Sequence, residues 1–188
     1  EMSAIYMKQG TLKLQDASCS VIRNDGGASV NAHAIYMQAG QLDSINTTYN
    51  MTGNYSTGIK MLDGRLNVIN GGWIITGTNS YGIHSSINSD TDFVINNSSF
   101  DIDGANSTGI YSAKGRVNIS SDEGNGISVT GANGKGIHVL DKGSVNSINY
   151  SYALSGDGSI GILADSDATG INVVNGAMSV SGSLTYGI

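Results

Sequence analysis

One short phrase recurs along the whole chain. AIYMKQGTLKL begins at Ala4 and returns thirty residues later as AIYMQAGQLDS. Looser copies keep a Gly-Ile pair, and the anchor isoleucines are Ile5, Ile35, Ile59, Ile83, Ile110, Ile137, Ile162 and Ile188. The intervals between them are 30, 24, 24, 27, 27, 25 and 26 residues, so the period is about 26. A period of this length predicts a solenoid, a propeller or another repeat array.

The composition favours a β solenoid over a helical one. The 188 residues include 27 glycines and no proline, and only 13% of them are charged. Helical repeats need long runs of Ala, Leu, Glu and Lys, which this chain lacks. Each coil of a β solenoid must turn several times, so glycine and asparagine are expected at turn positions with positive φ.

Each repeat contains three short stretches in which apolar and polar residues alternate. This period of two indicates strands rather than helices, and glycine and asparagine separate the stretches. In the fifth repeat the inward positions are Ile110, Ser112, Val117, Ile119, Ile127 and Val129. Six inward positions of this kind recur from repeat to repeat, whereas the positions between them are mostly polar.

The repeats therefore predict an all-β fold, a parallel β-helix of about seven coils with three short strands in each coil. Like strands would stack about 4.8 Å apart from coil to coil. A propeller is the alternative, but its blades use four antiparallel strands and about 40 residues. Residues 1–188 read as one β-helix segment, and since the chain starts and stops inside a repeat, we expect a longer solenoid around it.

Charge and hydropathy narrow the classes of partner. The net charge is −6 with nine Lys and Arg residues, so we do not expect a nucleic-acid partner. No apolar run approaches twenty residues and no leader is visible, which predicts a soluble segment without membrane insertion.

The sulfur-containing residues do not point to a metal site. Cys19 is the one cysteine, which excludes an internal disulfide and predicts an inert, buried thiol. Met7, Met37 and Met61 fall on inward positions, which favours core packing over a soft-metal ladder.

The anchor repeats resemble a known family. GIYSAKGRVNIS at 109–120, with GIKMLDGRLNVIN and YGIHSSINS before it, is similar to the pertactin-like passenger domains of bacterial autotransporters. The resemblance covers all 188 residues through a degenerate repeat. It implies a right-handed β-helix that a C-terminal β-barrel translocator, located elsewhere in the precursor, exports through the outer membrane. The passenger would then be displayed on the bacterial surface or secreted as an adhesin or other virulence factor.

β-Helix enzymes gather carboxylates on neighbouring coils, so acidic side chains at equivalent positions of adjacent coils would indicate a catalytic site. Asp101 and Asp103 face outward together, but the equivalent positions in adjacent coils are not acidic. Two further pairs, Asp90 with Asp92 and Asp165 with Asp167, are expected in turns, where aspartate is favoured for local hydrogen bonding. A calcium site in these turns is an alternative, although the nonapeptide of calcium-binding β-rolls does not occur.

The three histidines do not suggest a metal or catalytic centre. His33, His84 and His138 belong to different coils, and the last two are expected about 10 Å apart along the stack. They are too far apart to share one metal ion, and no motif supplies a serine nucleophile. The sequence therefore predicts no catalytic residue, no metal site and no cofactor.

One outward position carries large side chains in every coil, directly after the anchor isoleucine. We call its members the aromatic column: Tyr6, Tyr36, Lys60, His84, Tyr111 and His138, with Leu163 next in line. Such a column either stabilises the exposed sheet through neighbouring pairs or serves as a contact surface, because exposed aromatics anchor interfaces.

These observations lead to a functional hypothesis with two alternatives. The leading hypothesis is a non-enzymatic, extracellular passenger segment that binds a host-cell surface protein or glycan through the aromatic column. One alternative is a carbohydrate-active β-helix enzyme, a polysaccharide lyase or glycosidase, with acids in turns or in other coils. The other alternative is a structural stalk that carries a distal domain.

Overall fold

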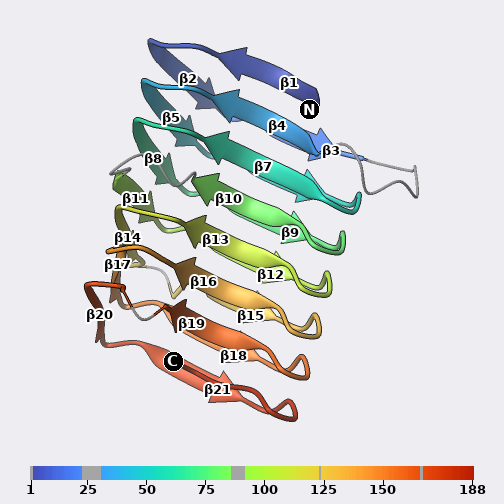
Figure 1. The fold of residues 1–188 in the computed structure, drawn as a ribbon, viewed down its shortest axis with the longest axis vertical. Helices are drawn as coiled ribbons and strands as arrows, with labels where there is room; N and C mark the ends of the chain where they lie inside the picture. Colours follow the sequence, from blue (N-terminus) through green and yellow to red (C-terminus); the bar gives the residue numbers. More distant parts are fainter. Residues whose placement is uncertain (1, 23–30, 86–91, 123, 166) are drawn as a thin grey trace.

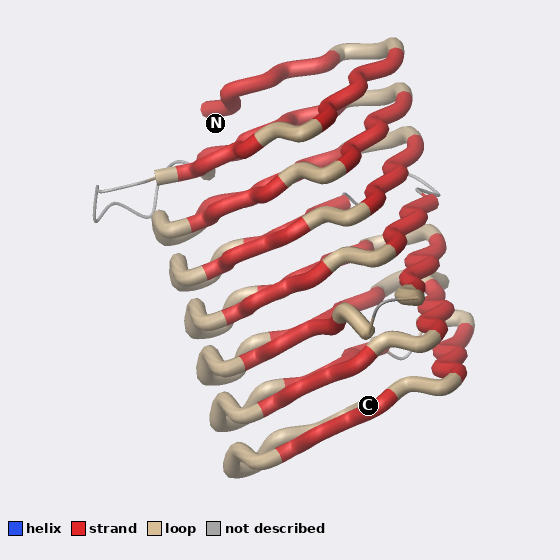
Figure 2. The backbone as a smooth tube through the Cα atoms, turned by 180° about the vertical axis from the view of Figure 1, so that it is seen from behind, coloured by secondary structure: helices blue, strands red, loops and turns tan. Residues whose placement is uncertain are grey.

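The computed structural model describes residues 2–22, 31–85, 92–122, 124–165 and 167–188. Within these ranges the chain forms twenty-one strands, β1 to β21, and no helix. The coils stack into a rod with the N-terminus at one end, as Figures 1 and 2 show from opposite sides. The all-β prediction is therefore confirmed.

The strands form three parallel seven-stranded sheets, and each coil contributes one strand to each sheet. Sheet A contains β1 (Met2–Met7), β4 (Ala32–Met37), β7 (Ser56–Met61), β10 (Tyr81–Ser85), β13 (Thr108–Ser112), β16 (Lys135–Val139) and β19 (Ile160–Ala164). Sheet B contains β2 (Thr11–Gln15), β5 (Gln41–Ile45), β8 (Arg65–Ile69), β11 (Asp92–Asn96), β14 (Arg116–Ser120), β17 (Ser144–Ile148) and β20 (Gly170–Val174). Sheet C contains β3 (Ser18–Val21), β6 (Thr48–Met51), β9 (Gly72–Ile75), β12 (Ser99–Ile102), β15 (Gly126–Val129), β18 (Ser151–Leu154) and β21 (Ala177–Val180).

The chain winds as a right-handed β-helix. In Figure 1 it runs along sheet A in front, turns through sheet B at the left and returns along sheet C behind, one level lower in each coil. From the first to the last strand of a sheet this makes about six turns of roughly 26 residues. The predicted three strands per coil and the predicted period are both confirmed.

The register follows the anchor isoleucines. Ile5 pairs with Ile35 and Ile35 with Ile59, and the same column continues through every strand of sheet A. The eighth anchor, Ile188, lies one coil beyond Ile162. The Ile162 amide donates a hydrogen bond of 3.0 Å to the carbonyl of Gly187, the residue before Ile188. The repeated phrase therefore marks the alignment of the coils.

The core lies between the three sheets and is made by the predicted inward positions. Ile110 and Ile137 of sheet A are fully buried, as are Met37 and Met61, whereas Met7 in the first coil is partly buried and packs against the same core. On sheet C three rings stack face to face: the ring centroids of Tyr49 and Trp73 lie 5.0 Å apart, and those of Trp73 and Phe100 lie 4.4 Å apart. Each buried large apolar side chain contributes roughly 1.5–3 kcal/mol to folding.

Asparagines with positive φ form a ladder along the turns from sheet B to sheet C. Asn46 has a φ of 50° and Asn70 has a φ of 55°. The Asn46 side-chain amide donates to Asp16 at 2.8 Å, and that of Asn70 donates to Asn46 at 3.0 Å. Asparagine tolerates this backbone conformation and also links one coil to the next, which explains its frequency in the sequence.

Glycines at the turns from sheet A to sheet B approach each other too closely to permit a side chain. At Gly64 the φ is +112°, and a Cβ atom there would lie 2.1 Å from the Gly40 carbonyl oxygen. Gly40 has the same relation to Gly10 in the preceding coil, with a distance of 2.2 Å. This column therefore requires glycine for both conformation and space.

Candidate functional site

The aromatic column is continuous in the structure. Tyr6 pairs with Tyr36 and Tyr36 with Lys60, so these side chains occupy one row on the outer face of sheet A. The row continues through His84 and Tyr111, which pair in register. His138 and Leu163 complete it on β16 and β19. The six residues of the aromatic column thus lie side by side, one from each successive coil.

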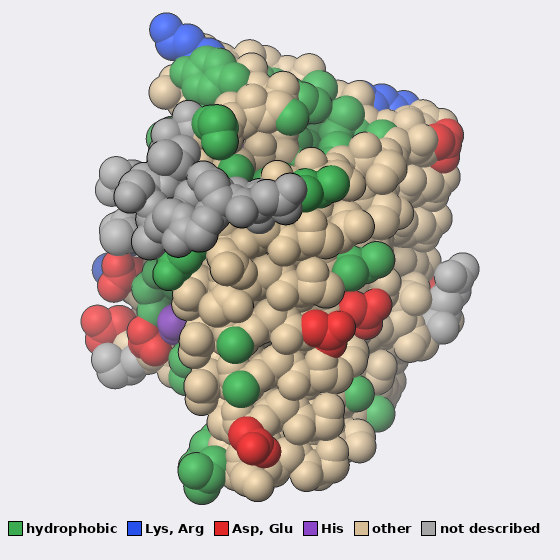
Figure 3. Space-filling model, turned by 90° about the vertical axis from the view of Figure 1, so that its right-hand side faces the viewer, with side chains coloured by type: hydrophobic (Ala, Val, Ile, Leu, Met, Phe, Trp, Pro, Cys, Tyr) green, Lys and Arg blue, Asp and Glu red, His purple; other side chains and the backbone are tan. Residues whose placement is uncertain are grey.

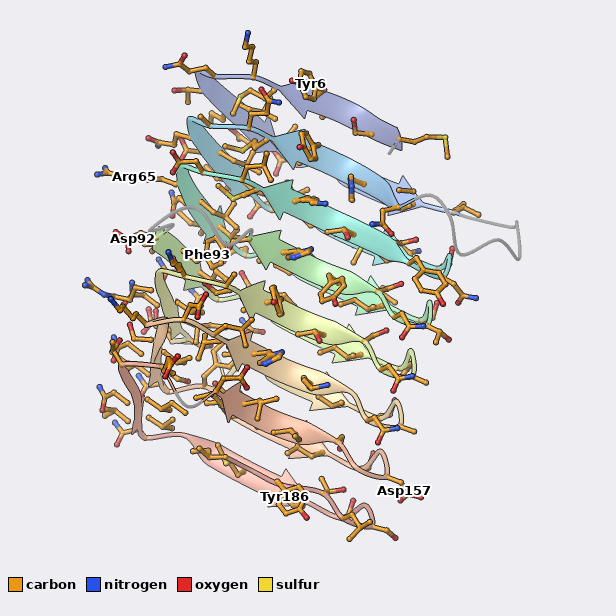
Figure 4. All side chains as sticks on the ribbon, in the orientation of Figure 1. Tyr6, Arg65, Asp92, Phe93, Asp157 and Tyr186 are labelled. Atoms are coloured by element: carbon orange, nitrogen blue, oxygen red, sulfur yellow. The ribbon has the colours of Figure 1, made fainter. Side chains whose placement is uncertain are left out.

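Exposure differs along the aromatic column. Tyr6 is 56% exposed, and Figure 4 shows it on the strand at the N-terminal end of the rod. The other five residues are half-buried. In each case the column residues of the preceding and the following coil cover part of the side chain. The side chains are therefore held in place rather than projecting freely.

The N-terminal half of the aromatic column is stacked. The rings of Tyr6 and Tyr36 are nearly parallel, with centroids 5.7 Å apart and an interplanar angle of 11°. The Lys60 ammonium lies 5.9 Å from the centre of the Tyr36 ring, within the range of a cation–π contact. These contacts fix two rings and a positive charge along about three coils.

The C-terminal half of the aromatic column packs edge to face. The His84 and Tyr111 rings are 4.8 Å apart at 88°, and Tyr111 and His138 are 5.2 Å apart at 82°. The Nε2 atom of His138 lies 3.5 Å from a carboxylate oxygen of Asp165. This distance is long for a hydrogen bond, so the contact becomes an ion pair only when His138 is protonated.

A second column lies beside the aromatic column on sheet A, and sequence reasoning missed it. Its members in register are His33, Thr57, Tyr81, Thr108 and Lys135. Tyr81 comes two residues before Ile83 and therefore reads as inward in a pattern of period two. In the structure the ladder skips Gly82, and Tyr81 pairs with Thr57 and Thr108 instead of joining the core. Its ring stacks on His84, three residues later, with centroids 4.8 Å apart. An interrupted ladder thus places residues three apart on the same face.

The glycine of the anchor phrase is the signal that could have revealed this second column. A Cβ atom on Gly82 would lie 2.6 Å from the Gly109 carbonyl oxygen and 3.1 Å from the Trp73 ring, so this position accepts only a small residue. A small residue that recurs inside a strand often marks a local irregularity of the ladder.

The two columns enclose a pocket over β4, β7 and β10, which we call the sheet A pocket. Its volume is about 370 Å³. His33 and Thr57, both 3% exposed, are its most buried lining residues. Lys60, Tyr81 and His84 line it from the strands, and Asn31, Tyr55 and Asn79 line it from the adjoining turns. The strands position the ring and ammonium groups, and the turns add amide and hydroxyl groups.

The electrostatics of the sheet A pocket keep His84 neutral. Burial, together with the positive charge of Lys60 and the proximity of His33, lowers the pKa of His84 from 6.5 to about 4. Burial also lowers the pKa of His138, which Asp165 opposes by favouring the protonated ring. At neutral pH the aromatic column therefore presents uncharged rings around the charge of Lys60.

Asp101 has no acidic neighbour in register on the described strands, whereas Asp141 and Asp167 line one pocket together with Lys114 and Lys142. Asp101 is exposed and lies between Ile74 and Ser128 in register, as predicted. Asp103 accepts a hydrogen bond from the Thr130 hydroxyl of the next coil. Figure 3 shows acidic side chains in small separate patches on a mostly uncharged surface.

The expectation for Asp92 was wrong, because this residue begins strand β11 instead of lying in a turn. It pairs in register with Arg65, and both project from the outer face of sheet B in Figure 4. The opposite charge on the neighbouring strand accounts for an aspartate at this position. Asp90 lies outside the described residues, whereas Asp165 and Asp167 follow β19 in a turn, as predicted.

No metal centre emerges from the described residues. Among residues 2–22, 31–85, 92–122, 124–165 and 167–188, no three His, Cys, Asp or Glu side chains converge on one point. His84 and His138 are separated by Tyr111, two coils apart as the sequence predicts. The Cys19 thiol is half-buried in the first coil, and burial raises its pKa.

Comparison with known proteins gives no match. No protein-family model, no curated protein and no solved structure matches the chain significantly. The resemblance to autotransporter passengers therefore rests on the repeat. In the described ranges the structure offers no helix long and apolar enough to cross a membrane.

Proposed function

We propose that this β-helix belongs to an extracellular binding protein of the autotransporter passenger type. It would be displayed on a bacterial surface or secreted, and it would act without catalysis by binding a host-cell surface protein or glycan. The observation that carries the proposal is the aromatic column, a row of six large side chains in register on sheet A.

The aromatic column has physical properties that suit an interface. At about 4.8 Å per coil, the five steps from Tyr6 to His138 span about 24 Å. This length is similar to the width of a standard interface patch of roughly 800 Å² on each partner. The rings contact one another, so binding would immobilise few additional rotamers, and that reduces the entropic cost of association.

The non-enzymatic part of the proposal is supported by the arrangement of the acids. Asp101 has an isoleucine and a serine as its neighbours in register, and Asp103 is engaged by Thr130. Hydrolysis or lyase chemistry needs groups that act together on one sugar unit. These two carboxylates have no such partner among the described residues.

The proposal is tested by measuring binding of the purified chain to host cells and to a glycan panel. A triple variant, Tyr6→Ser with Tyr36→Ser and Tyr111→Ser, should lose most of the binding while circular dichroism shows an intact β fold. The matched control carries Ile74→Ser on sheet C and Val94→Ser on sheet B, which are 40% and 39% exposed. Binding that survives the triple variant, or that the control removes equally, would refute the role of the aromatic column.

A further inference from the structure

The turns from sheet A to sheet B differ in length between coils. Three residues separate β7 from β8 and β13 from β14, and each of these turns ends in a glycine with positive φ, Gly64 or Gly115. The turn between β16 and β17 has four residues, 140–143, and the turn between β19 and β20 has five, 165–169. In solenoid proteins such additions form loops on one face, which is often the binding face.

The 140–143 and 165–169 turns are joined by hydrogen bonds. The Lys142 amide donates to the Asp167 carbonyl at 2.8 Å, and the Thr169 hydroxyl donates to the Lys142 carbonyl at 2.9 Å. Within the 140–143 turn, the Gly143 amide donates to the Leu140 carbonyl at 2.7 Å. The side chains on these turns therefore project from a fixed backbone, which reduces the entropic cost of binding a ligand there.

The backbone of the 140–143 turn is strained. Asp141 and Lys142 have φ angles of 35° and 64°, so two successive residues other than glycine adopt a left-handed conformation. The three-residue turns use a glycine for positive φ, and glycine adopts it without steric cost. Other residues in this conformation cluster at ligand-binding and active sites. The strain therefore points to a role for the Lys142 side chain that glycine could not fulfil.

The two longer turns and the turn of the preceding coil form a pocket, which we call the turn pocket. Its volume is about 560 Å³, within the range of small-molecule sites. Its described lining contains two positive charges, two negative charges and one hydroxyl, from Lys114, Lys142, Asp141, Asp167 and Thr169. Ser166, the one residue of the two longer turns outside the described ranges, carries no charge.

The charges of the two longer turns are available to a ligand. The one ion pair between described residues joins His138 to Asp165, so Asp141, Lys142 and Asp167 have no partner of opposite charge within 4 Å among those residues. A ligand with a single charge would meet repulsion as well as attraction in the turn pocket. A ligand that carries both signs can place each charge beside its opposite.

We propose that the turn pocket binds a zwitterionic ligand, one that carries an ammonium group and a carboxylate group. The ammonium contacts Asp141 and Asp167, and the carboxylate contacts Lys142. Free amino acids have this chemistry, as do peptide segments in which a basic side chain adjoins an acidic one. The turn pocket contains no residue of the aromatic column, so this inference goes beyond the proposed function and does not depend on it. Because these side chains are exposed, we expect millimolar affinity that decreases with added salt.

The test follows the backbone amide NMR signals of the purified chain during titration with γ-aminobutyrate, butylamine, butyrate and the peptide acetyl-Gly-Lys-Glu-Gly-amide. Butylamine and butyrate each lack one charge of γ-aminobutyrate, which should bind at least about fivefold more tightly than either. The amide signals of Lys142 and Asp167 should shift during the titration. Tighter binding of the peptide than of γ-aminobutyrate identifies a protein segment as the source of the ligand, and otherwise the source is a small molecule.

Two variants keep the 140–143 turn and remove one charge each. Asparagine tolerates a left-handed backbone, so Asp141→Asn and Lys142→Asn should give circular dichroism spectra like that of the unmodified chain. Asp141→Asn should reduce the advantage of γ-aminobutyrate over butyrate, and Lys142→Asn should reduce its advantage over butylamine. Asp63→Asn, in the three-residue turn between β7 and β8, is the matched control and should bind like the unmodified chain.

Several results would overturn the inference. They are binding of butylamine or butyrate as tight as that of γ-aminobutyrate, no binding of any probe, and signal shifts only outside the two longer turns. Unchanged probe preferences in both Asp141→Asn and Lys142→Asn, or an equal loss of binding in Asp63→Asn, would overturn it as well. Cell binding by the aromatic column is measured separately, so a failure of the turn pocket leaves the proposed function standing, and the reverse also holds.

Discussion

Ser44 and Tyr49 share a hydrogen bond of 2.9 Å inside the core, across the turn that joins sheet B to sheet C. Both residues are fully buried. The same pair recurs four coils later, where Ser147 and Tyr152 are also 2.9 Å apart. A serine at an inward position of sheet B is thus satisfied by a tyrosine hydroxyl from sheet C, five residues later in the chain.

Removing one partner of this pair should cost more than removing both. Tyr49→Phe leaves the Ser44 hydroxyl buried without a partner, which should lower the free energy of unfolding by about 1–3 kcal/mol. Adding Ser44→Ala to that variant should restore part of the loss, because no unsatisfied hydroxyl then remains. Urea denaturation of the four chains gives the coupling free energy. Strict additivity of the two single changes would contradict the pairing.

Adjacent residues of β13 should respond oppositely to the same substitution. Ile110 is fully buried, so Ile110→Asp places an unpaired charge in the core and should destabilise the rod by roughly 3 kcal/mol or more. Tyr111 faces outward, and Tyr111→Asp should cost less than about 1 kcal/mol. Thermal melting followed by circular dichroism compares them. Similar damage at both positions would overturn the assignment of inner and outer faces.

Two glycines of one coil should differ sharply on replacement by alanine. Gly64→Ala forces a side chain into a left-handed conformation and against the Gly40 backbone, so we expect a loss of about 2 kcal/mol or more. Gly72→Ala meets no atom closer than 3.9 Å and should change stability by less than about 0.5 kcal/mol. Chemical denaturation measures both. A tolerated Gly64→Ala would show that the turns from sheet A to sheet B are less tightly stacked.

The pKa of His84 predicts a dependence of stability on pH. The pKa is about 4 in the folded chain against an ordinary value of 6.5, so between these two pH values the unfolded state binds the extra proton. Protonation of this ring therefore favours unfolding as the pH falls, and the free energy of unfolding should decrease through this window. Measuring the melting temperature from pH 7 to pH 4 should show a smaller decrease for His84→Gln. Identical pH profiles for the two chains would contradict the lowered pKa.

The fold could be predicted from the sequence because each structural constraint repeats in every coil. Ile110, Val117 and Ile127 alternate with polar residues on three successive stretches, and the same pattern returns about every 26 residues. A parallel β-helix places equivalent residues of successive coils in register, so one anchor phrase determines the alignment of all three sheets. Even in the first coil the register holds, since Cys19 of β3 pairs with Tyr49 of β6.

The candidate site could be predicted only in part. The aromatic column follows from strand alternation, since Tyr111 comes directly after a buried isoleucine. The sheet A pocket does not, because the ladder skips Gly82 and so brings Tyr81 onto the same face as His84. The contribution of turn residues such as Asn79 depends on how the coils stack in space, which the period of the sequence does not specify.

The most direct test of the central claim changes one outward residue on each face of a single coil. Lys60→Glu, Asn67→Glu and Ile74→Glu lie on β7, β8 and β9, and so on sheets A, B and C. Each purified variant is compared with the unmodified chain for binding to host cells, after circular dichroism confirms the fold. We predict that Lys60→Glu alone loses binding. Equal binding by all three variants, or a loss confined to sheet B or sheet C, would contradict the claim that sheet A is the binding face.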